Sequence, residues 1–179
     1  MGEIRMRLFI AVDVPPEVKR AVGRAQKELP EKGGLKRVEL PMMHITLKFL
    51  GEVSPRMLDR VDGVLREISF SPFRVKVRGV GVFPNKKYIR VVWAGCEGQE
   101  LAGLAGKMNE KLGGMFPEDT FSPHITMARV KRDLVLDDYL KKYGNERFGE
   151  FSVREFHLVE SVLGPGGAKY NTLATYSGR

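Results

Sequence analysis

Alternating and helical patterns of apolar residues divide the chain into two halves with the same order of elements. The first half is predicted to contain a strand over Arg7–Val12, a helix from Pro15-Pro16 to about Leu29, a strand around His44, a helix from Ser54-Pro55 to about Ile68, and the strand Phe73–Val82. The second half is predicted to contain a strand over Tyr88–Trp93, a helix over Gln99–Leu112, a strand around His124, a helix near Leu134–Tyr143, and the strand Phe151–Val159. Each half therefore reads as strand, helix, strand, helix, strand.

The spacing of these elements indicates an internal duplication. Leu8 precedes His44 by 36 residues, and Tyr88 precedes His124 by 36 residues, so equivalent positions are offset by 80. This plan predicts an α+β fold with two pseudo-symmetric lobes, each a mainly antiparallel sheet with outer helices, around a central cleft. We expect residues 1–179 to form a single bilobal domain with an approximate repeat of 1–83 and 84–179.

Glycine and proline mark the predicted turns. Gly79 and Gly81 together with 83–87 are expected to form the turn between the halves. Gly164-Pro165-Gly166-Gly167 is expected to be a loop, followed by a last short strand over Tyr170–Tyr176.

Composition excludes several classes of protein. Hydrophobic residues make up 42% of the chain, but no apolar run approaches the roughly 18 residues that a membrane helix requires. The stretch from Met1 to Arg7 has no cleavage region typical of a signal peptide, which favours a cytoplasmic location. The one cysteine, Cys96, cannot form an internal disulfide or a thiolate zinc site. We expect a monomer without a metal or cofactor.

The net charge of +8 narrows the choice of partner. The chain has 30 Lys and Arg residues but only 22 Asp and Glu residues. A positive net charge of this size attracts polyanions. The charge favours a nucleic-acid partner, although a merely soluble basic surface has the same composition.

The same tripeptide occurs at matching points of the two halves. His44-Ile45-Thr46 lies in the first half, and His124-Ile125-Thr126 lies in the second. In a strand, residues i and i+2 share a face, so each histidine stands beside its threonine while the isoleucine faces a core. If the halves are related by a pseudo-two-fold axis, the two pairs converge on one site.

Two histidines with two hydroxyls suit the opening of a cyclic phosphate. One imidazole activates water on one side of phosphorus, and the other protonates the departing ribose oxygen. The hydroxyls of Thr46 and Thr126 can donate to the non-bridging oxygens, and a cation can offset their charge. Lys48, four residues after His44, lies on the same face by simple alternation and is a candidate phosphate or RNA-backbone contact.

Each of these features also has a structural interpretation. A duplicated structural strand would copy His and Thr without any chemistry. A lysine at a strand end is as often solvated as it is functional. His157 has no partner threonine nearby in the sequence and no counterpart in the repeat, so we expect it to be structural.

The sequence resembles the two-histidine phosphoesterase superfamily, and within it the archaeal and bacterial RNA 2′,3′-cyclic phosphodiesterases once described as 2′-5′ RNA ligases. Besides the two His-Ile-Thr segments, the likeness includes Arg7–Val12, Phe83-Pro84, the strand with Trp93, and the region from Ser161 to Tyr170. The resemblance implies ATP-independent opening of a terminal RNA 2′,3′-cyclic phosphate to a 2′-phosphate, with a weak reverse 2′-5′ joining of RNA ends. RNA ends with a cyclic phosphate, tRNA fragments among them, are the expected partners.

The resemblance also implies roles for individual residues. His44 would be the proton donor, and His124 would be the acceptor that activates water. Arg129 matches the family's phosphate-binding arginine. Strict alternation places Arg129 on the other face from His124, and a bulge would bring it back. Phe83 and Tyr170 are candidate platforms for stacking a base.

Two other functions remain open at this point. A non-catalytic RNA-binding module would explain the charge and the cleft but not the repeated His-Thr pairs. A phosphodiesterase for small cyclic phosphates, such as nucleoside 2′,3′-cyclic phosphates or ADP-ribose cyclic phosphate, would use the same pairs without RNA. Phosphoryl transfer from ATP is disfavoured, because the sequence contains no Gly-x-x-x-x-Gly-Lys-Ser/Thr loop.

Overall fold

A computed structural model describes residues 4–179, which are dominated by one antiparallel sheet. Its strands are β1 (Met6–Asp13), β2 (Lys36–Arg37), β3 (His44–Val53), β4 (Phe73–Asn85), β5 (Tyr88–Glu97), β6 (His124–Arg129), β7 (Arg147–Val153), β8 (Glu155–Gly164) and β9 (Gly167–Ser177). The helices are α1 (Pro16–Lys27), α2 (Pro55–Arg66), α3 (Gln99–Leu112), α4 (Asp137–Tyr143) and the short 3₁₀ helix η1 (Leu40–Met42). The predicted α+β class is confirmed.

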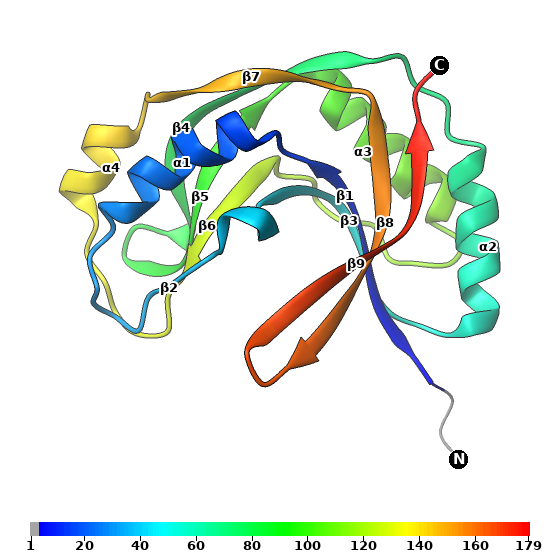
Figure 1. Cartoon of the computed structure of the whole chain (residues 1–179), viewed down its shortest axis with the longest axis horizontal. Coiled ribbons are helices and arrows are strands. Elements are labelled where there is room, and N and C mark those ends of the chain that lie inside the picture. The colour runs from blue at the N-terminus through cyan, green and yellow to red at the C-terminus, as the bar shows by residue number, and fades with distance from the viewer. Residues whose placement is uncertain (1–3) are drawn as a thin grey trace.

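The sheet repeats one strand order on both sides of its centre. Its strands run β7-β4-β5-β6-β3-β1-β8-β9, and β2 adds to β6. β1 lies between β3 and β8, as β5 lies between β6 and β4. β4, from the first half of the sequence, therefore pairs with β5 of the second half, and β8, from the second half, pairs with β1 of the first half. Figure 1 shows α1 and α4 at one end of the curved sheet and α2 and α3 at the other.

The cross-strand register refines the offset between the halves. Ala11 in β1 lies opposite Thr46, and Trp93 in β5 lies opposite Thr126. The histidine strands thus correspond with an offset of 80 (Thr46 to Thr126), whereas their neighbours correspond with an offset of 82 (Ala11 to Trp93).

Two details of the predicted strands are wrong. The stretch 151–159 is not one strand, because β7 ends at Val153 and pairs with β4, whereas β8 begins at Glu155 and pairs with β1. The alternation breaks there, since Arg154 and Glu155 are both exposed. The predicted turn at 79–87 is also shorter than expected, because β4 continues to Asn85. The side chain of Asn85 accepts hydrogen bonds from the backbone N–H groups of Lys87 and Tyr88, which closes a tight hairpin.

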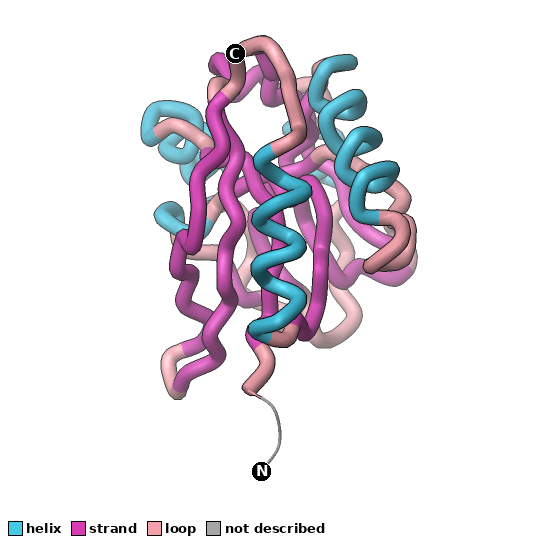
Figure 2. Tube along the Cα trace, turned by 90° about the vertical axis from the view of Figure 1, so that its right-hand side faces the viewer, coloured by secondary structure: helices cyan, strands magenta, loops and turns pink. Residues whose placement is uncertain are grey.

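The last hairpin is longer than the sequence predicts. β8 and β9 pair from Glu155 and Ser177 to Gly164 and Gly167, so the glycine-rich segment is a tight turn within a long ribbon. Figure 2 shows these two strands side by side along much of the molecule, with helices outside the strands.

The helices begin where proline and a cap predict them. Pro16 and Pro55 occupy the first turns of α1 and α2, where a missing N–H costs nothing. The hydroxyl of Ser54 accepts a bond of 3.4 Å from the backbone N–H of Met57.

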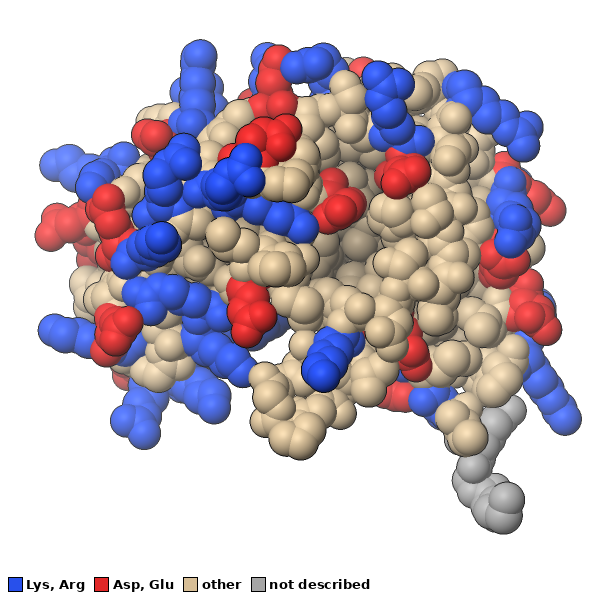
Figure 3. Space-filling view, viewed as in Figure 1, with Lys and Arg blue, Asp and Glu red and all other residues tan. Residues whose placement is uncertain are grey.

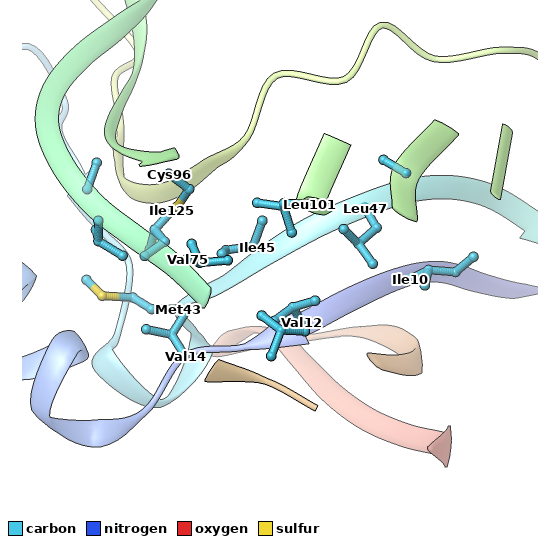
Figure 4. Close-up of a cluster of buried hydrophobic side chains, with 14 of the residues drawn as sticks. Ile10, Val12, Val14, Met43, Ile45, Leu47, Val75, Cys96, Leu101 and Ile125 are labelled. Carbon is cyan, nitrogen blue, oxygen red and sulfur yellow. The ribbon is translucent and has the colours of Figure 1, made fainter. Parts of the chain in front are cut away.

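The main core lies between the helices and one face of the sheet. Ile45, Ile125 and Met127 are fully buried there, and Leu47 is almost so, as their strand positions predict. Figure 4 shows Ile45 and Leu47 beside Leu101 of α3, and Ile125 beside Cys96. Because Ile45 and Ile125 are buried in this core, the histidines and threonines on either side of them must project from the opposite face of the sheet.

Within residues 4–179, no helix is long and apolar enough to cross a membrane. The prediction about an export signal concerns Met1–Arg7, of which Met1–Glu3 lie outside the described residues.

Candidate active site

The two histidine strands are neighbours at the centre of the sheet. β3 and β6 pair antiparallel at Ile45 and Ile125. Extending this register by one residue in each direction places His44 opposite Thr126 and Thr46 opposite His124. All four side chains project from the face opposite the buried isoleucines. The sequence duplication thus becomes one compact group of two imidazoles and two hydroxyls.

A cavity of about 530 Å³ lies over this group. His44, Thr46, His124, Thr126 and Arg129 all line it. Among the described residues that line the cavity there is no aspartate or glutamate. A cavity with basic and hydroxyl groups but no carboxylate suits an anion such as a phosphate.

Each imidazole is held by the carbonyl two residues before it. His44 Nδ1 lies 2.8 Å from the Met42 carbonyl oxygen, and His124 Nδ1 lies 2.6 Å from that of Ser122. A carbonyl can only accept, so each Nδ1 carries a hydrogen and donates it. In the neutral ring Nε2 is then the free base, and in the charged ring Nε2–H is the acid. Both rings therefore work through Nε2.

The surroundings of both rings lower their pKa values. Burial lowers the pKa of His44 below its ordinary value of 6.5, and the charges of Lys19 and His124 act in the same direction. The bond to Met42 and the carboxylate of Asp13 oppose this shift. Burial also lowers the pKa of His124, and the charge of Arg129 lowers it further, against the bond to Ser122.

Aromatic rings flank each histidine. Phe9 and Tyr170 lie 5.0 and 5.3 Å from His44, ring centre to ring centre. Phe83 lies 5.1 Å from His124, edge to face, and Trp93 lies 6.5 Å away. The two candidate stacking residues, Phe83 and Tyr170, therefore both reach the cavity wall.

Arg129 enters the cavity through a β-bulge. In β6, Val92 lies opposite Ala128 and Trp93 lies opposite Thr126, so Met127 is an extra residue. Met127 and Ala128 are both buried, and Arg129 returns to the face of Thr126. The expectation that a bulge brings Arg129 back to the face of His124 agrees with this geometry.

The equivalent bulge in β3 removes Lys48 from the cavity, so the prediction that it faces the site is wrong. In β3, Ile10 lies opposite Lys48 and Ala11 lies opposite Thr46, which leaves Leu47 as the extra residue. Lys48 consequently points to the core side and is only 1% exposed. Its ammonium group is 2.6 Å from Asn109 Oδ1, 2.7 Å from the Pro117 carbonyl and 3.4 Å from Asp119. Lys48 therefore ties β3 to α3 and to the loop that leads into β6.

Among the other residues that line the cavity, three large side chains were not predicted as part of the site, namely Phe49, Arg7 and Phe9. Phe49 takes the place in β3 that Arg129 has in β6, and it is 62% exposed. Arg7 and Phe9 project from the same side of β1 as Ala11. Applying the bulge to both halves, instead of to Arg129 alone, would have identified Phe49 and excluded Lys48.

His157 does not line this cavity. Its Nδ1 lies 2.9 Å from Thr175 Oγ1 across the β8–β9 pair, and its Nε2 lies 3.6 Å from Glu155. The histidine thus has a partner threonine after all, on the neighbouring strand, where sequence spacing does not reveal it.

Comparison with known proteins identifies the family of this chain. The model of the LigT like Phosphoesterase family matches residues 12–93 and 95–170. An RNA 2′,3′-cyclic phosphodiesterase of Archaeoglobus fulgidus is 43% identical, with 96% of this chain and 99% of that protein covered. A protein of the same name from Methanocaldococcus jannaschii is 36% identical, with 94% and 98% covered.

Solved structures share the fold over the whole chain. A crystal structure of a Thermus thermophilus protein has a TM-score of 0.84 at 33% identity, with 96% of this chain and 97% of that chain covered. Escherichia coli LigT, crystallised with phosphate, has a TM-score of 0.81 at 25% identity, with 99% of both chains covered. Family model, full-length relatives and fold agree, and the chain is therefore a hydrolase that belongs to the LigT-like phosphoesterase family.

Proposed function

We propose that this enzyme hydrolyses the 2′,3′-cyclic phosphate at the 3′ end of an RNA to a 2′-phosphate, using His44 and His124 as acid and base and requiring neither ATP nor a metal ion. The observation that carries the proposal is the meeting of both His-Thr pairs and Arg129 in one cavity, whose lining among residues 4–179 includes no carboxylate. The names of the Archaeoglobus and Methanocaldococcus relatives support the choice of substrate.

Two proton transfers complete the reaction. His124, neutral, accepts a proton from water at Nε2 as the water oxygen attacks phosphorus. The bond from phosphorus to the ribose 3′ oxygen breaks, and His44, protonated, donates from Nε2 to that oxygen. The products are a free 3′ hydroxyl and a 2′-phosphate, and the two histidines have exchanged protonation states. Each positioned acid or base contributes a factor of about 10² to 10⁴.

The remaining groups bind the phosphate. The hydroxyls of Thr46 and Thr126 donate to its non-bridging oxygens, and the guanidinium of Arg129 balances their negative charge. The crystallisation of E. coli LigT with phosphate supports an anion site in this fold. Lys48 has no part in this binding, because it lies in the core.

The basic surface offers a path for the RNA body. Lys and Arg side chains gather over α1, α4 and β2 on the face shown in Figure 3. Lys36 of β2 lies directly opposite Arg129 of β6, so this surface begins at the edge of the cavity. Phosphates upstream of the RNA end can bind there in a salt-dependent manner. A weak joining of RNA ends uses the same acid and base: an RNA 5′ hydroxyl replaces water as the nucleophile, the bond from phosphorus to the ribose 3′ oxygen breaks, and a 2′-5′ linkage forms.

The direct test uses an oligoribonucleotide with a 2′,3′-cyclic phosphate end, without ATP and with a chelator. We expect an oligonucleotide with a 2′-phosphate as the product. A 3′-phosphate product or a requirement for a divalent ion would contradict the proposal. Nucleoside 2′,3′-cyclic phosphates, tested in parallel, separate an RNA enzyme from one for small cyclic phosphates, because only the former gains kcat/KM from the RNA body.

A further inference from the structure

A second cavity of about 370 Å³ adjoins the first on the side of His44. The two cavities share Phe9, Met42, His44 and Tyr170 in their walls. The rings of Phe9, His44 and Tyr170 form a cluster with centres 5.0 to 5.3 Å apart. A ligand that occupies both cavities would lie against this one aromatic wall.

The second cavity, here named the Ala11 pocket, is open because the small residue Ala11 lies beside Thr46 in the sheet. Ala11 of β1 and Val159 of β8 are buried against Phe9 and form an apolar floor. Polar groups around that floor come from Thr172, from His157, which lies opposite Ala11, and from Asp13, which is paired with Lys19 at 3.0 Å. The pocket is therefore apolar at its base and carries both donors and acceptors at its edge.

The equivalent position in the other half is filled by an indole. Ala11 lies opposite Thr46 as Trp93 lies opposite Thr126. Trp93 covers Gly81, the residue opposite it on β4, where an added Cβ would come within 2.2 Å of the indole. The space beside His44 is thus open, whereas the corresponding space beside His124 is occupied by protein.

This asymmetry matches the needs of the two reacting groups. The oxygen that receives a proton from His44 belongs to the terminal ribose, so that nucleoside must lie on the His44 side of phosphorus. The water activated by His124 needs little room. We propose, resting on the proposed function, that the Ala11 pocket binds the base of the terminal nucleoside while its cyclic phosphate lies over His44 and His124. Flat aromatic walls with a few polar groups are how proteins bind the splayed bases of RNA ends.

The pocket then determines the direction of the substrate. A site with two His-Thr pairs in pseudo-symmetric positions could accept the phosphate in either orientation. With a space for the base on one side and an indole on the other, only one orientation brings the ribose 3′ oxygen to His44. The mixed polar edge, with Asp13, Lys19 and Thr172, suits all four bases and predicts weak selectivity among them.

The experiment changes the two partners independently: a tryptophan substitution fills the pocket in the protein, and a second substrate lacks the terminal base. Thr172 is exposed at the pocket edge, so Thr172→Trp can fill the pocket from outside. Leu173 is also exposed but does not line the pocket, so Leu173→Trp is the matched control. Each protein is assayed with an oligoribonucleotide ending in a 2′,3′-cyclic phosphate and with the same oligonucleotide lacking its terminal base. For the wild type and Leu173→Trp, we expect base removal to lower kcat/KM by about 5- to 100-fold, the range for one stacked base.

For Thr172→Trp, we expect nearly equal kcat/KM on both substrates, at the level of the wild type on the base-free one. Ala11→Trp places an indole at the position of Trp93, although opposite His157 instead of a glycine, and should behave in the same way if its thermal unfolding shows a folded protein. Wild-type turnover that ignores the base, or a full base effect in both tryptophan variants, would overturn the pocket assignment and leave the proposed function standing. Failure of the wild type on both substrates would overturn the proposed function, and this inference with it.

Discussion

The His44 half and the His124 half of the site share their scaffold and differ in what surrounds it. In both halves, a carbonyl two residues before the histidine fixes Nδ1, a threonine follows at i+2, and a bulge comes directly after. Beyond the bulge, Phe49 faces the cavity in one half and Arg129 in the other. Beside the threonine, the first half has Ala11 and the second has Trp93.

The shared features supply what acid and base both require, which is an imidazole fixed through Nδ1 that can exchange a proton through Nε2. The differences supply what a directional reaction requires. Under the proposed function, the cation of Arg129 on the His124 side binds the phosphate and favours the neutral form of His124, whereas the open space on the His44 side accommodates the ribose and its base. Under the proposed function, the duplication provides the catalytic pair, and its divergence provides the orientation.

Replacing either histidine should have the largest effect. We expect His44→Asn and His124→Asn each to lower kcat/KM for cyclic phosphate hydrolysis by at least about a hundredfold. The double variant should lose little more than the worse single variant, because the two groups act in one step. Initial rates with a cyclic-phosphate oligonucleotide measure this, and two small, additive losses would show that the histidines are only structural.

Arg129 should matter more than its counterpart Phe49. Arg129→Met removes a charged donor to the phosphate, and we expect a loss in kcat/KM of about 10- to 100-fold. Because its charge lowers the pKa of His124, its removal should raise that pKa and move the acidic limb of the pH profile to higher pH. Phe49→Met is the control and should leave that limb in place. An unmoved limb in Arg129→Met would contradict the geometry.

Replacing Lys48 should lower the stability of the fold, because this residue lies in the core and not in the cavity. Lys48→Met leaves the Pro117 carbonyl and Asn109 without their buried donor, which should lower the free energy of unfolding by about 1–3 kcal/mol. Lys107, which donates to one exposed backbone carbonyl, is the control, and Lys107→Met should stay within about 0.5 kcal/mol. Urea unfolding of both variants decides the matter, and equal midpoints would show that the buried ammonium adds nothing.

The two threonines should differ by a small factor. His44 Nε2 lies 2.9 Å from Thr46 Oγ1, whereas for His124 only the bond through Nδ1 is present among residues 4–179. Thr46 therefore orients the proposed acid in addition to its proposed contact with the phosphate. We expect Thr46→Val to lower kcat/KM by about tenfold and Thr126→Val by a smaller factor. The reverse order, in parallel assays, would place the stronger threonine contact on the His124 side.

Sequence patterns predicted the elements well because both periodicities are strong in this chain. Strand alternation and helix starts located most of the strands and all four α-helices, and the offset of the histidines revealed the repeat. The patterns could not show that β4 and β8 pair with strands of the opposite half, because alternation does not specify a partner. They also merged β7 and β8, which are separated by only one residue, Arg154.

In the site, sequence reasoning succeeded where strict alternation holds and failed after the bulges. His44, Thr46, His124 and Thr126 precede the bulges and face the cavity together. Lys48 follows one and is turned into the core, whereas Phe49 is turned out. A bulge depends on pairing with a neighbouring strand, so local sequence contains little trace of it.

The pH dependence of kcat/KM, measured with a cyclic-phosphate oligonucleotide and a chelator, tests the paired roles of the histidines most directly. Activity should rise with pH as His124 loses its proton and fall as His44 loses its own. Because the pKa values of both free histidines are lowered from 6.5, we expect a bell-shaped profile with its maximum below that pH. Residual activity of His124→Asn should lack the acidic limb, and that of His44→Asn should lack the alkaline limb. A profile without a bell, or variants that keep both limbs, would contradict the assignment of acid and base to these two residues.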